Sequence, residues 1–297
     1  MGANFMRYFK VLFFFFSIIT LQISAFQNND LQKAKQFLED NKLEEAKAIL
    51  EEIIDDDDKN HEAYFNLGKT YMRLKDPEEA TENFEEAVDL QDKNADYHFW
   101  LGQAIAMDAQ NSNVISQAMM ASDILKEFER TIDLDPKHIP GLMGVIGFYT
   151  NAPGIMGGDI EKAERHAKEL VKLDEMRGRT SLAQIYFKQE KMDSAEIQIS
   201  ILEEKFKNDR SLGNIYNSLG YYYLGEDNVE KAIEAFEKQV KVNPESANSH
   251  DSLGDGYKAA GRRDDAIAQY KKALEINPDF SASADNLEEL QDKMEEE

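Results

Sequence analysis

Large apolar and small residues recur along this chain at a fixed spacing of 34 positions. Leu219-Gly220 and Leu253-Gly254 lie 34 residues apart, and a tyrosine follows each glycine three positions later. Polar residues fill the positions between them with the three-to-four-residue period of an amphipathic helix. A helical period that restarts at a fixed short interval predicts repeated pairs of antiparallel helices.

The small residues mark the places where the two helices of a pair cross. With each unit numbered from 1 to 34, the unit over 247–280 has small residues at places 8, 20 and 27 and an aromatic at 24: Gly254, Ala266, Ala273 and Tyr270. Two helices approach closely only where Gly or Ala occupies the contact, and a bulky side chain one turn away fills the space beside it. Pro278 then ends the second helix. The pattern therefore predicts tight helical hairpins.

This arrangement of small and bulky places resembles the tetratricopeptide repeat. The resemblance implies an all-α fold, a right-handed α-solenoid of about seven hairpins, whose last unit is capped by a helix over 281–297. The predicted solenoid covers 26–280, with units at about 27–60, 61–94, 95–138, 139–175, 176–212, 213–246 and 247–280.

The third and fourth units depart from the common pattern. Phe128 and Pro136 arrive about ten residues late, and the extra stretch 107–121 predicts a longer helical hairpin with a polar tip. The fourth unit inserts a Pro/Gly-rich loop, 151–158, and Asp159 is the expected N-cap of the helix after it. This combination resembles exported bacterial tetratricopeptide proteins of unassigned activity, and it implies no reaction.

The first 25 residues have the pattern of a signal peptide. Arg7 and Lys10 precede an uncharged apolar run over 11–23, which is shorter than the about 20 residues that a membrane span needs. We expect cleavage after Ala25 and export to the periplasm or the medium, and the alternative is an uncleaved membrane anchor. The chain has no cysteine, which excludes a lipid-modified cysteine and disulfide bonds.

The charge of the chain narrows the classes of partner. With 58 acidic and 34 basic side chains, its formal net charge is −24. Such an excess repels phosphate backbones and anionic membrane surfaces, so we expect no nucleic acid partner and, once the signal peptide is cleaved, no stable membrane insertion. A protein or peptide is the expected partner. The sequence leaves the oligomeric state open.

The side chains that carry out catalysis or bind metals do not form a recognisable motif. The five histidines are not paired at helical ligand spacing, and no serine lies in a nucleophile elbow. His98 and His250 both fall at place 4, where the repeat packs a large side chain, which favours a position in the core. The glycine-rich stretch 154–158 lacks the lysine and hydroxyl of a phosphate loop. We expect no enzyme activity, cofactor or metal.

The resemblance implies that the first helix of each unit lines a concave groove through places 2, 5, 6, 9 and 12. The candidate partner-binding residues at these places are Phe65, Lys69, Phe99, Trp100, Gln103, Gln184, Asn217, Tyr221, Asp251 and Asp255. Aromatic side chains are good anchors for an extended or helical peptide. Phe99 and Trp100 have an alternative interpretation, because both could instead cover the long third hairpin.

One binding mode of this family is disfavoured by the residues present. The carboxylate clamp of chaperone-binding members needs lysine and asparagine at places 5 and 9 of its first unit. Phe65 and Lys69 stand at those places here. We therefore expect no clamp for acidic C-termini.

The leading hypothesis is a noncatalytic, exported scaffold that binds a protein or peptide in its groove. The insertions of the third and fourth units would form a second contact surface. An alternative is a carrier or receptor for a small molecule or lipid, which would lie between the groove and the methionine-rich insertion around Met107, Met119, Met120 and Met156. An enzyme with an unrecognised site is a third possibility, with no residue assigned to it.

Overall fold

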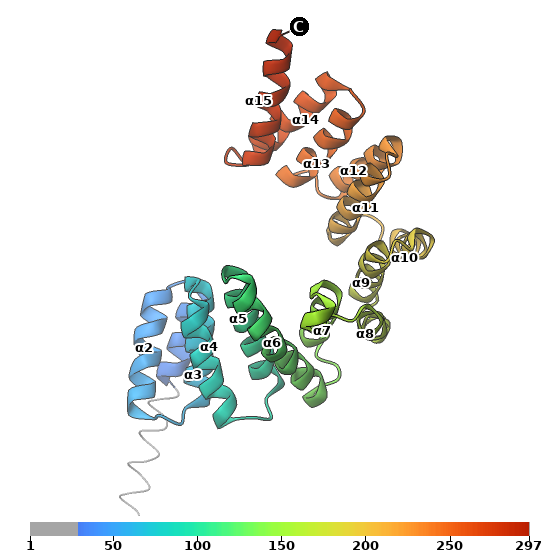
Figure 1. Ribbon diagram of the computed structural model, residues 1–297. Helices are drawn as coiled ribbons and strands as arrows, with labels where there is room; N and C mark the ends of the chain where they lie inside the picture. The colour runs from blue at the N-terminus through green and yellow to red at the C-terminus, as the bar shows by residue number, and fades with distance from the viewer. Residues whose placement is uncertain (1–28, 297) are drawn as a thin grey trace, which may run out of the picture. The chain divides into compact units, whose positions relative to one another are not determined.

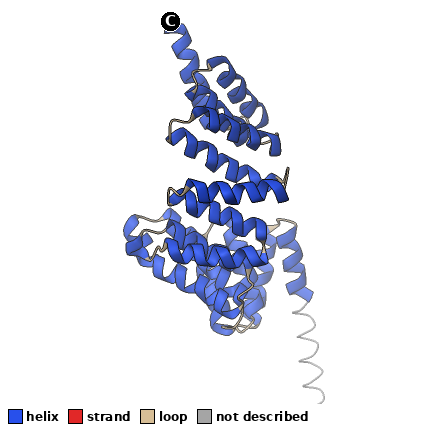
Figure 2. Cartoon of the chain, turned by 90° about the vertical axis from the view of Figure 1, so that its right-hand side faces the viewer, coloured by secondary structure: helices blue, strands red, loops and turns tan. Residues whose placement is uncertain are grey.

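All regular elements in the described part of the chain are helices. The computed structural model describes residues 29–296, and Figures 1 and 2 show helices joined by short loops throughout this range. No helix in this range is both long and apolar enough to cross a membrane. The predicted signal peptide over 1–25, with its cleavage or retention as an anchor, lies outside the described residues.

Contacts between helices divide the chain into two compact bodies, whose described parts are residues 29–163 and 164–296, so that the boundary falls within helix α8 (Ile160–Leu173). The described part of the N-terminal body begins with a helix over 29–39. It continues with α2 (Leu43–Asp56), α3 (His61–Leu74), α4 (Pro77–Leu90), α5 (Ala95–Asn111), α6 (Val114–Leu134), α7 (Ile139–Asn151) and the short helix η1 (Gly154–Met156).

The C-terminal body contains the rest of α8 and a second series of hairpins. Its elements are α9 (Glu175–Lys188), α10 (Met192–Lys205), η2 (Arg210–Leu212), α11 (Gly213–Gly225), α12 (Val229–Val242), α13 (Ala247–Ala259), α14 (Arg263–Ile276) and α15 (Ser281–Glu296). In both bodies most helices pack against the next along the chain, as in α3 with α4 and α13 with α14. The predicted all-α solenoid of helical hairpins is confirmed.

The glycines at place 8 allow the close helix crossings. A Cβ atom added to Gly68 would lie 2.7 Å from the Phe84 ring, and one added to Gly254 would lie 2.5 Å from the ring of Tyr270. Phe84 and Tyr270, at place 24, are both fully buried. Because such distances are shorter than van der Waals contact, only glycine fits at these crossings.

Side-chain caps fix where several helices begin. Asn60 accepts a hydrogen bond from the backbone N–H of Ala63, and Asp76 accepts one from that of Glu79. The predicted cap at Asp159 is confirmed, because its carboxylate accepts from the backbone N–H of Lys162 at 3.0 Å.

The long third hairpin differs in one respect from its prediction. Its turn is polar, and Asn113 caps α6 by accepting from backbone N–H groups. However, the first turns of α6 carry apolar side chains in solvent: Val114, Ile115 and Met119 are 68%, 75% and 73% exposed. The end of the hairpin is therefore an uncharged apolar surface and not only a polar tip.

Both histidines at place 4 are buried and tie a hairpin to the loop before it. His98 donates from Nε2 to the backbone carbonyl of Asp92, and Nε2 of His250 does the same to the carbonyl of Pro244, both at 2.9 Å. Their Nδ1 atoms face the side chains of Glu127 and Gln269 on the second helix of the hairpin. The predicted core position of these histidines is confirmed.

Candidate functional site

The N-terminal body has an open groove formed by the first helices of its first three hairpins. These are the helix over 29–39, α3 and α5, and the groove has a volume of about 410 Å³. We call it the N-terminal groove. It is lined by Lys35, Leu38, Glu39, Glu62, Phe65, Asn66, Lys69, Arg73, Asn94, Asp96 and Tyr97.

Phe65 gives the groove an aromatic floor. Its ring stacks on Tyr97 with centroids 4.5 Å apart, and it lies 5.7 Å from the buried ring of Phe84. Burial, followed by the charge of Glu62, raises the pKa of Tyr97 to about 12, so this phenol stays neutral. Phe65 itself is only half-buried, which leaves part of its ring open to the groove.

Lys69 lies on the same face of α3, one turn beyond Phe65. Its Nζ atom is 5.5 Å from the centroid of the Phe65 ring and 5.6 Å from that of Trp100. Within the described residues, this ammonium makes neither a hydrogen bond nor an ion pair. Burial, and then the positive charge of Arg73, lowers the pKa of Lys69.

Two lining carboxylates already have partners. Lys35 Nζ donates to Glu62 Oε2 at 2.7 Å, and this bond holds the pKa of Glu62 below its usual range. His138 Nε2 lies 3.0 Å from Asp96 Oδ1. The guanidinium of Arg73 donates one N–H to the backbone carbonyl of Leu38.

The structure brings the other predicted aromatics of this body close to the groove without making them lining residues. Phe99 packs on Phe128, on His138 and, edge-on, on Trp100, with centroid distances of 6.1, 5.3 and 5.9 Å. Trp100 also lies 6.1 Å from Phe84. Both side chains are half-buried, so each is partly exposed and also helps to cover the third hairpin. Gln103 is half-buried one turn further along α5.

In the C-terminal body, Tyr221 and Asp255 form a hydrogen-bonded pair between α11 and α13. The Tyr221 hydroxyl donates to Asp255 Oδ2 at 2.7 Å, and buried Tyr270 donates to Oδ1 at 2.8 Å. Asn217 accepts from Ser252 at 2.7 Å. Burial is the main cause that raises the pKa values of Tyr221 and Tyr270. Of the remaining candidates, Gln184 on α9 is exposed.

Helix α15 contacts the groove residues of the last hairpin. Asp251 is 6% exposed and accepts a hydrogen bond of 2.6 Å from Ser283, and Asn286 donates to Asp255 at 3.3 Å. Burial raises the pKa of Asp251. The carboxylate of Asp251 thus lies beneath α15, and the exposed candidate at this end is Tyr221, which is 41% exposed.

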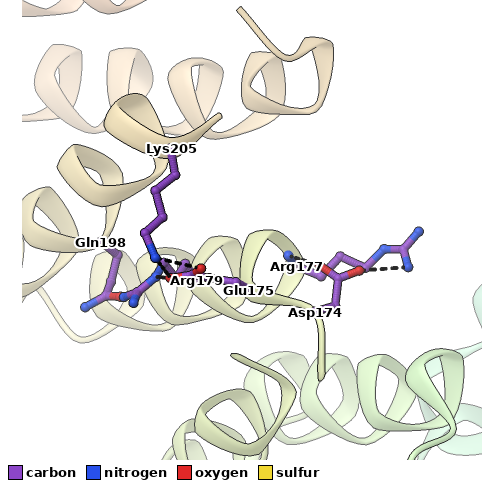
Figure 3. A network of polar contacts seen from close by, with 6 residues as sticks. All are labelled: Asp174, Glu175, Arg177, Arg179, Gln198 and Lys205. Atoms are coloured by element: carbon purple, nitrogen blue, oxygen red, sulfur yellow. Dashed lines mark hydrogen bonds and ion pairs between the residues drawn. The ribbon is translucent and has the colours of Figure 1, made fainter. Parts of the chain in front are cut away.

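Another polar network in this body joins the two helices of one hairpin (Figure 3). Glu175 on α9 accepts from Lys205 of α10 at 2.7 Å and from Arg179 at 2.8 Å, while Arg179 also donates to Gln198 of α10 at 2.9 Å. Hydrogen bonds from Lys205 and then Arg179 lower the pKa of Glu175. The network therefore connects α9 to α10, and its one carboxylate is shared by the two cations.

Of the charged lining residues, sequence reasoning named only Lys69 as a candidate and not Lys35, Glu39, Glu62, Arg73 or Asp96. Arg73 and Glu39 stand at place 13 of their units, just beyond the places that the family resemblance marks as groove-facing. The spacing of four residues between Lys69 and Arg73 could have identified Arg73, because residues at this spacing share a helix face.

Among the described residues, no three His, Asp or Glu side chains are grouped so that they could hold a metal ion.

Comparison with known proteins identifies the repeat. Residues 37–98 and 206–279 each match a family model described as tetratricopeptide repeat. No curated protein matches the sequence.

Solved structures give the same fold. A tetratricopeptide repeat protein from Parabacteroides merdae is 17% identical, with a TM-score of 0.67 over 89% of this chain and 98% of that one. Yeast Tom70 is 14% identical, with a TM-score of 0.68 over 86% of this chain and 52% of its own. PilW, a type IV pilus biogenesis factor, is 14% identical, with a TM-score of 0.54 over 88% and 98% of the two chains. At these identities the likeness shows the fold alone. The two family matches, the 34-residue spacing and the glycine-aromatic crossings together show that this chain is a tetratricopeptide repeat protein.

Proposed function

We propose that this protein is a noncatalytic, exported scaffold that binds a peptide or protein partner in the N-terminal groove. The fold suggests a protein–protein interaction scaffold, since helical repeats present extended surfaces. The observation that supports this groove most is the pairing of a half-open aromatic ring, Phe65, with the ammonium of Lys69, which has no ionic partner within the described residues. An anchor ring beside an unsatisfied donor suits a peptide segment.

Export is the part of the proposal that rests on sequence alone. It is supported by Arg7, Lys10 and the apolar run over 11–23. N-terminal sequencing of the protein recovered from the cell envelope tests it: a chain that starts at Phe26 supports cleavage, and an intact Met1 supports the anchor.

Photocrosslinking in the native envelope tests the groove. A photoreactive amino acid at Phe65 or at Trp100 should crosslink to one and the same protein, because Phe65 lines the groove and Trp100 lies close to it. The control probe replaces Glu86, an exposed residue of α4, the second helix of its hairpin. Adducts at Glu86 that equal those at Phe65 would contradict a groove-specific partner.

We further propose that the insertions of the third and fourth units form a second contact surface. Its apolar side chains are Val114, Ile115 and Met119 on α6, together with Ile155 in η1, which is 95% exposed. The stretch from 109 to 122 contains no charged residue, in a chain whose net charge is −24. Apolar exposure of this kind is typical of a surface that another molecule covers. A carrier would have to enclose its ligand, and the exposure of Met119 does not favour that alternative.

The double substitution Ile115→Asp with Met119→Asp tests this second surface. Because both side chains are mostly exposed, thermal stability should change by less than about 0.5 kcal/mol. Recovery of the partner crosslinked at Phe65 should fall. A matched variant, Asp108→Asn with Asp123→Asn, changes charge on the same hairpin without adding it to the apolar face and should leave recovery unchanged. If the partner were recovered fully with the double Asp variant, the proposal that these insertions form a contact surface would be wrong.

A further inference from the structure

We infer that the N-terminal groove selects peptides with an acidic side chain, whose carboxylate lies between Lys69 and Arg73 while a neighbouring apolar side chain packs on Phe65. This inference rests on the proposed function of the groove and names the class of peptide that it takes.

Lys69 provides the first argument. Its ammonium is half-buried over two aromatic rings and has no carboxylate in contact among the described residues. Charged groups removed from water are normally paired, and ring faces replace only part of the lost hydration. The lowered pKa of Lys69, caused first by burial and then by Arg73, reflects this missing counter-charge. A ligand carboxylate would supply it.

Arg73 provides the second argument. It lies four residues after Lys69 on α3, so two positive charges share one helix face, an arrangement that is destabilising by itself. Its guanidinium donates one N–H to the carbonyl of Leu38, and its other N–H groups have no partner within the described residues. A guanidinium fork fits a carboxylate well. One anion between the two cations would satisfy both.

The protein's own carboxylates leave this position open. Glu62 is bound to Lys35, and Asp96 is hydrogen-bonded to His138. Glu39, at the rim, is exposed, and both Asp96 and Glu39 act on Lys69 only through space. The anion is therefore expected from a ligand.

The spacing of the site predicts a sequence pattern in the peptide. Phe65 and Lys69 are four residues apart, about 6.0 Å along α3. In an extended peptide, side chains two residues apart point to the same side and are about 6.6 Å apart. The predicted motif is therefore an acidic residue two positions from an apolar or aromatic one.

An internal acidic side chain is favoured over a free C-terminus. The places that hold lysine and asparagine in the clamp for chain ends hold Phe65 and Lys69 here. The test must therefore separate the two sources of a carboxylate.

Selection from a phage library of random 12-residue peptides tests the inference. The peptides are displayed at the N-terminus of the coat protein, so they have no free C-terminus, and the purified full chain is immobilised as wild type, Lys69→Met or Phe65→Ala. Methionine keeps the length of the lysine stem without its charge, and thermal melting checks that each variant folds. Wild type should enrich Asp and Glu two positions from an apolar residue, and Lys69→Met should reduce only the acidic enrichment.

The best amidated peptide from this selection then gives the magnitude. Replacing its acidic residue by the corresponding amide should weaken binding to wild type on the order of tenfold in fluorescence anisotropy, and should weaken binding to Lys69→Met clearly less, because only Arg73 is left to bind the carboxylate. Equal acidic content in peptides selected by wild type and by Lys69→Met would overturn the inference and leave peptide binding in the groove intact. A free-acid peptide without acidic side chains that bound as tightly would also overturn it. Selected peptides that are insensitive to both Lys69→Met and Phe65→Ala would instead contradict the proposed groove function.

Discussion

Gly220→Leu is expected to destabilise the C-terminal body by about 3 kcal/mol or more. Even a Cβ atom at this position would lie 2.3 Å from Cε1 of Phe236, whose side chain is fully buried between α11 and α12. The rest of a leucine side chain must push this ring from its site, and forced overpacking of a core costs about 1–3 kcal/mol, occasionally more. The midpoint of thermal unfolding should fall by about 6–12 °C, measured by circular dichroism.

Gly225→Leu is the matched control, because it changes the same helix in the same way. No heavy atom lies within 4 Å of a Cβ at Gly225, and this residue ends α11. Its melting temperature should stay close to that of wild type. If both variants melted together, the steric account of place 8 would be wrong. Peptide binding in the N-terminal groove should survive in Gly220→Leu below its transition, since the groove lies in the other body.

The helical hairpins could be predicted from the sequence, because their contacts recur in several repeat units. A small residue at place 8 and an aromatic at place 24 are two halves of one contact, so Gly68 predicts its neighbour Phe84, as Gly254 predicts Tyr270. Both members lie within one 34-residue unit, and each contact recurs in other units. Because of this repetition, the hairpins can be predicted from a single sequence.

The polar contacts of the candidate site could not be predicted in the same way. Lys35 meets Glu62, and Ser283 meets Asp251, through helices that belong to different units. A repeat pattern predicts which helices are neighbours. It does not predict which charged side chains pair between them, because several charged residues on each helix could reach the same partner. The resemblance predicts that a helix over 281–297 caps the last unit, but it does not predict the hydrogen bond from Ser283 to the carboxylate of Asp251.

The exposed apolar turns of α6 were missed for another reason. Residues 107–121 are an insertion, so no equivalent place in another unit shows which of their side chains are buried. Their spacing is helical, but a helix extending past its neighbours leaves its apolar face uncovered, as Ile115 and Met119 show. Periodicity predicts an amphipathic helix and not the partner that covers it.

Glu127→Ala is the second substitution with a large expected effect. The Glu127 carboxylate is 2.5 Å from Nδ1 of buried His98 and 3.0 Å from Nζ of Lys126, and its side chain is only 6% exposed. Removing one partner of a buried ion pair leaves the other without compensation, which costs about 3–5 kcal/mol. We expect a loss of about 3 kcal/mol at neutral pH, seen as a lower midpoint in urea unfolding.

The pH dependence of wild type should carry the signature of this carboxylate. Burial acts to raise the pKa of Glu127, but hydrogen bonds and charge from His98 and Lys126 outweigh it, so the pKa is lowered in the folded protein. A carboxyl group with a depressed folded pKa stabilises the fold fully above its unfolded pKa, and this stabilisation is lost as the pH falls through the folded value. The difference in unfolding free energy between wild type and Glu127→Ala should therefore shrink on acidification below the ordinary glutamate value of 4.5.

The equivalent histidine of the last hairpin supplies the control for this pair. His250 makes the same bond to a loop carbonyl, but its Nδ1 faces the amide of Gln269 at 2.7 Å in place of a carboxylate. A glutamine can present either an N–H or an oxygen to the ring, so it satisfies a neutral imidazole that already donates from Nε2. Glu127→Gln should accordingly recover most of the stability lost in Glu127→Ala. Since neither variant has the carboxylate, the difference in unfolding free energy between these two variants should not change on acidification. If Glu127→Gln were as unstable as Glu127→Ala near neutral pH, the ion pair itself would be essential at this place, and the likeness to His250 and Gln269 would be one of geometry alone.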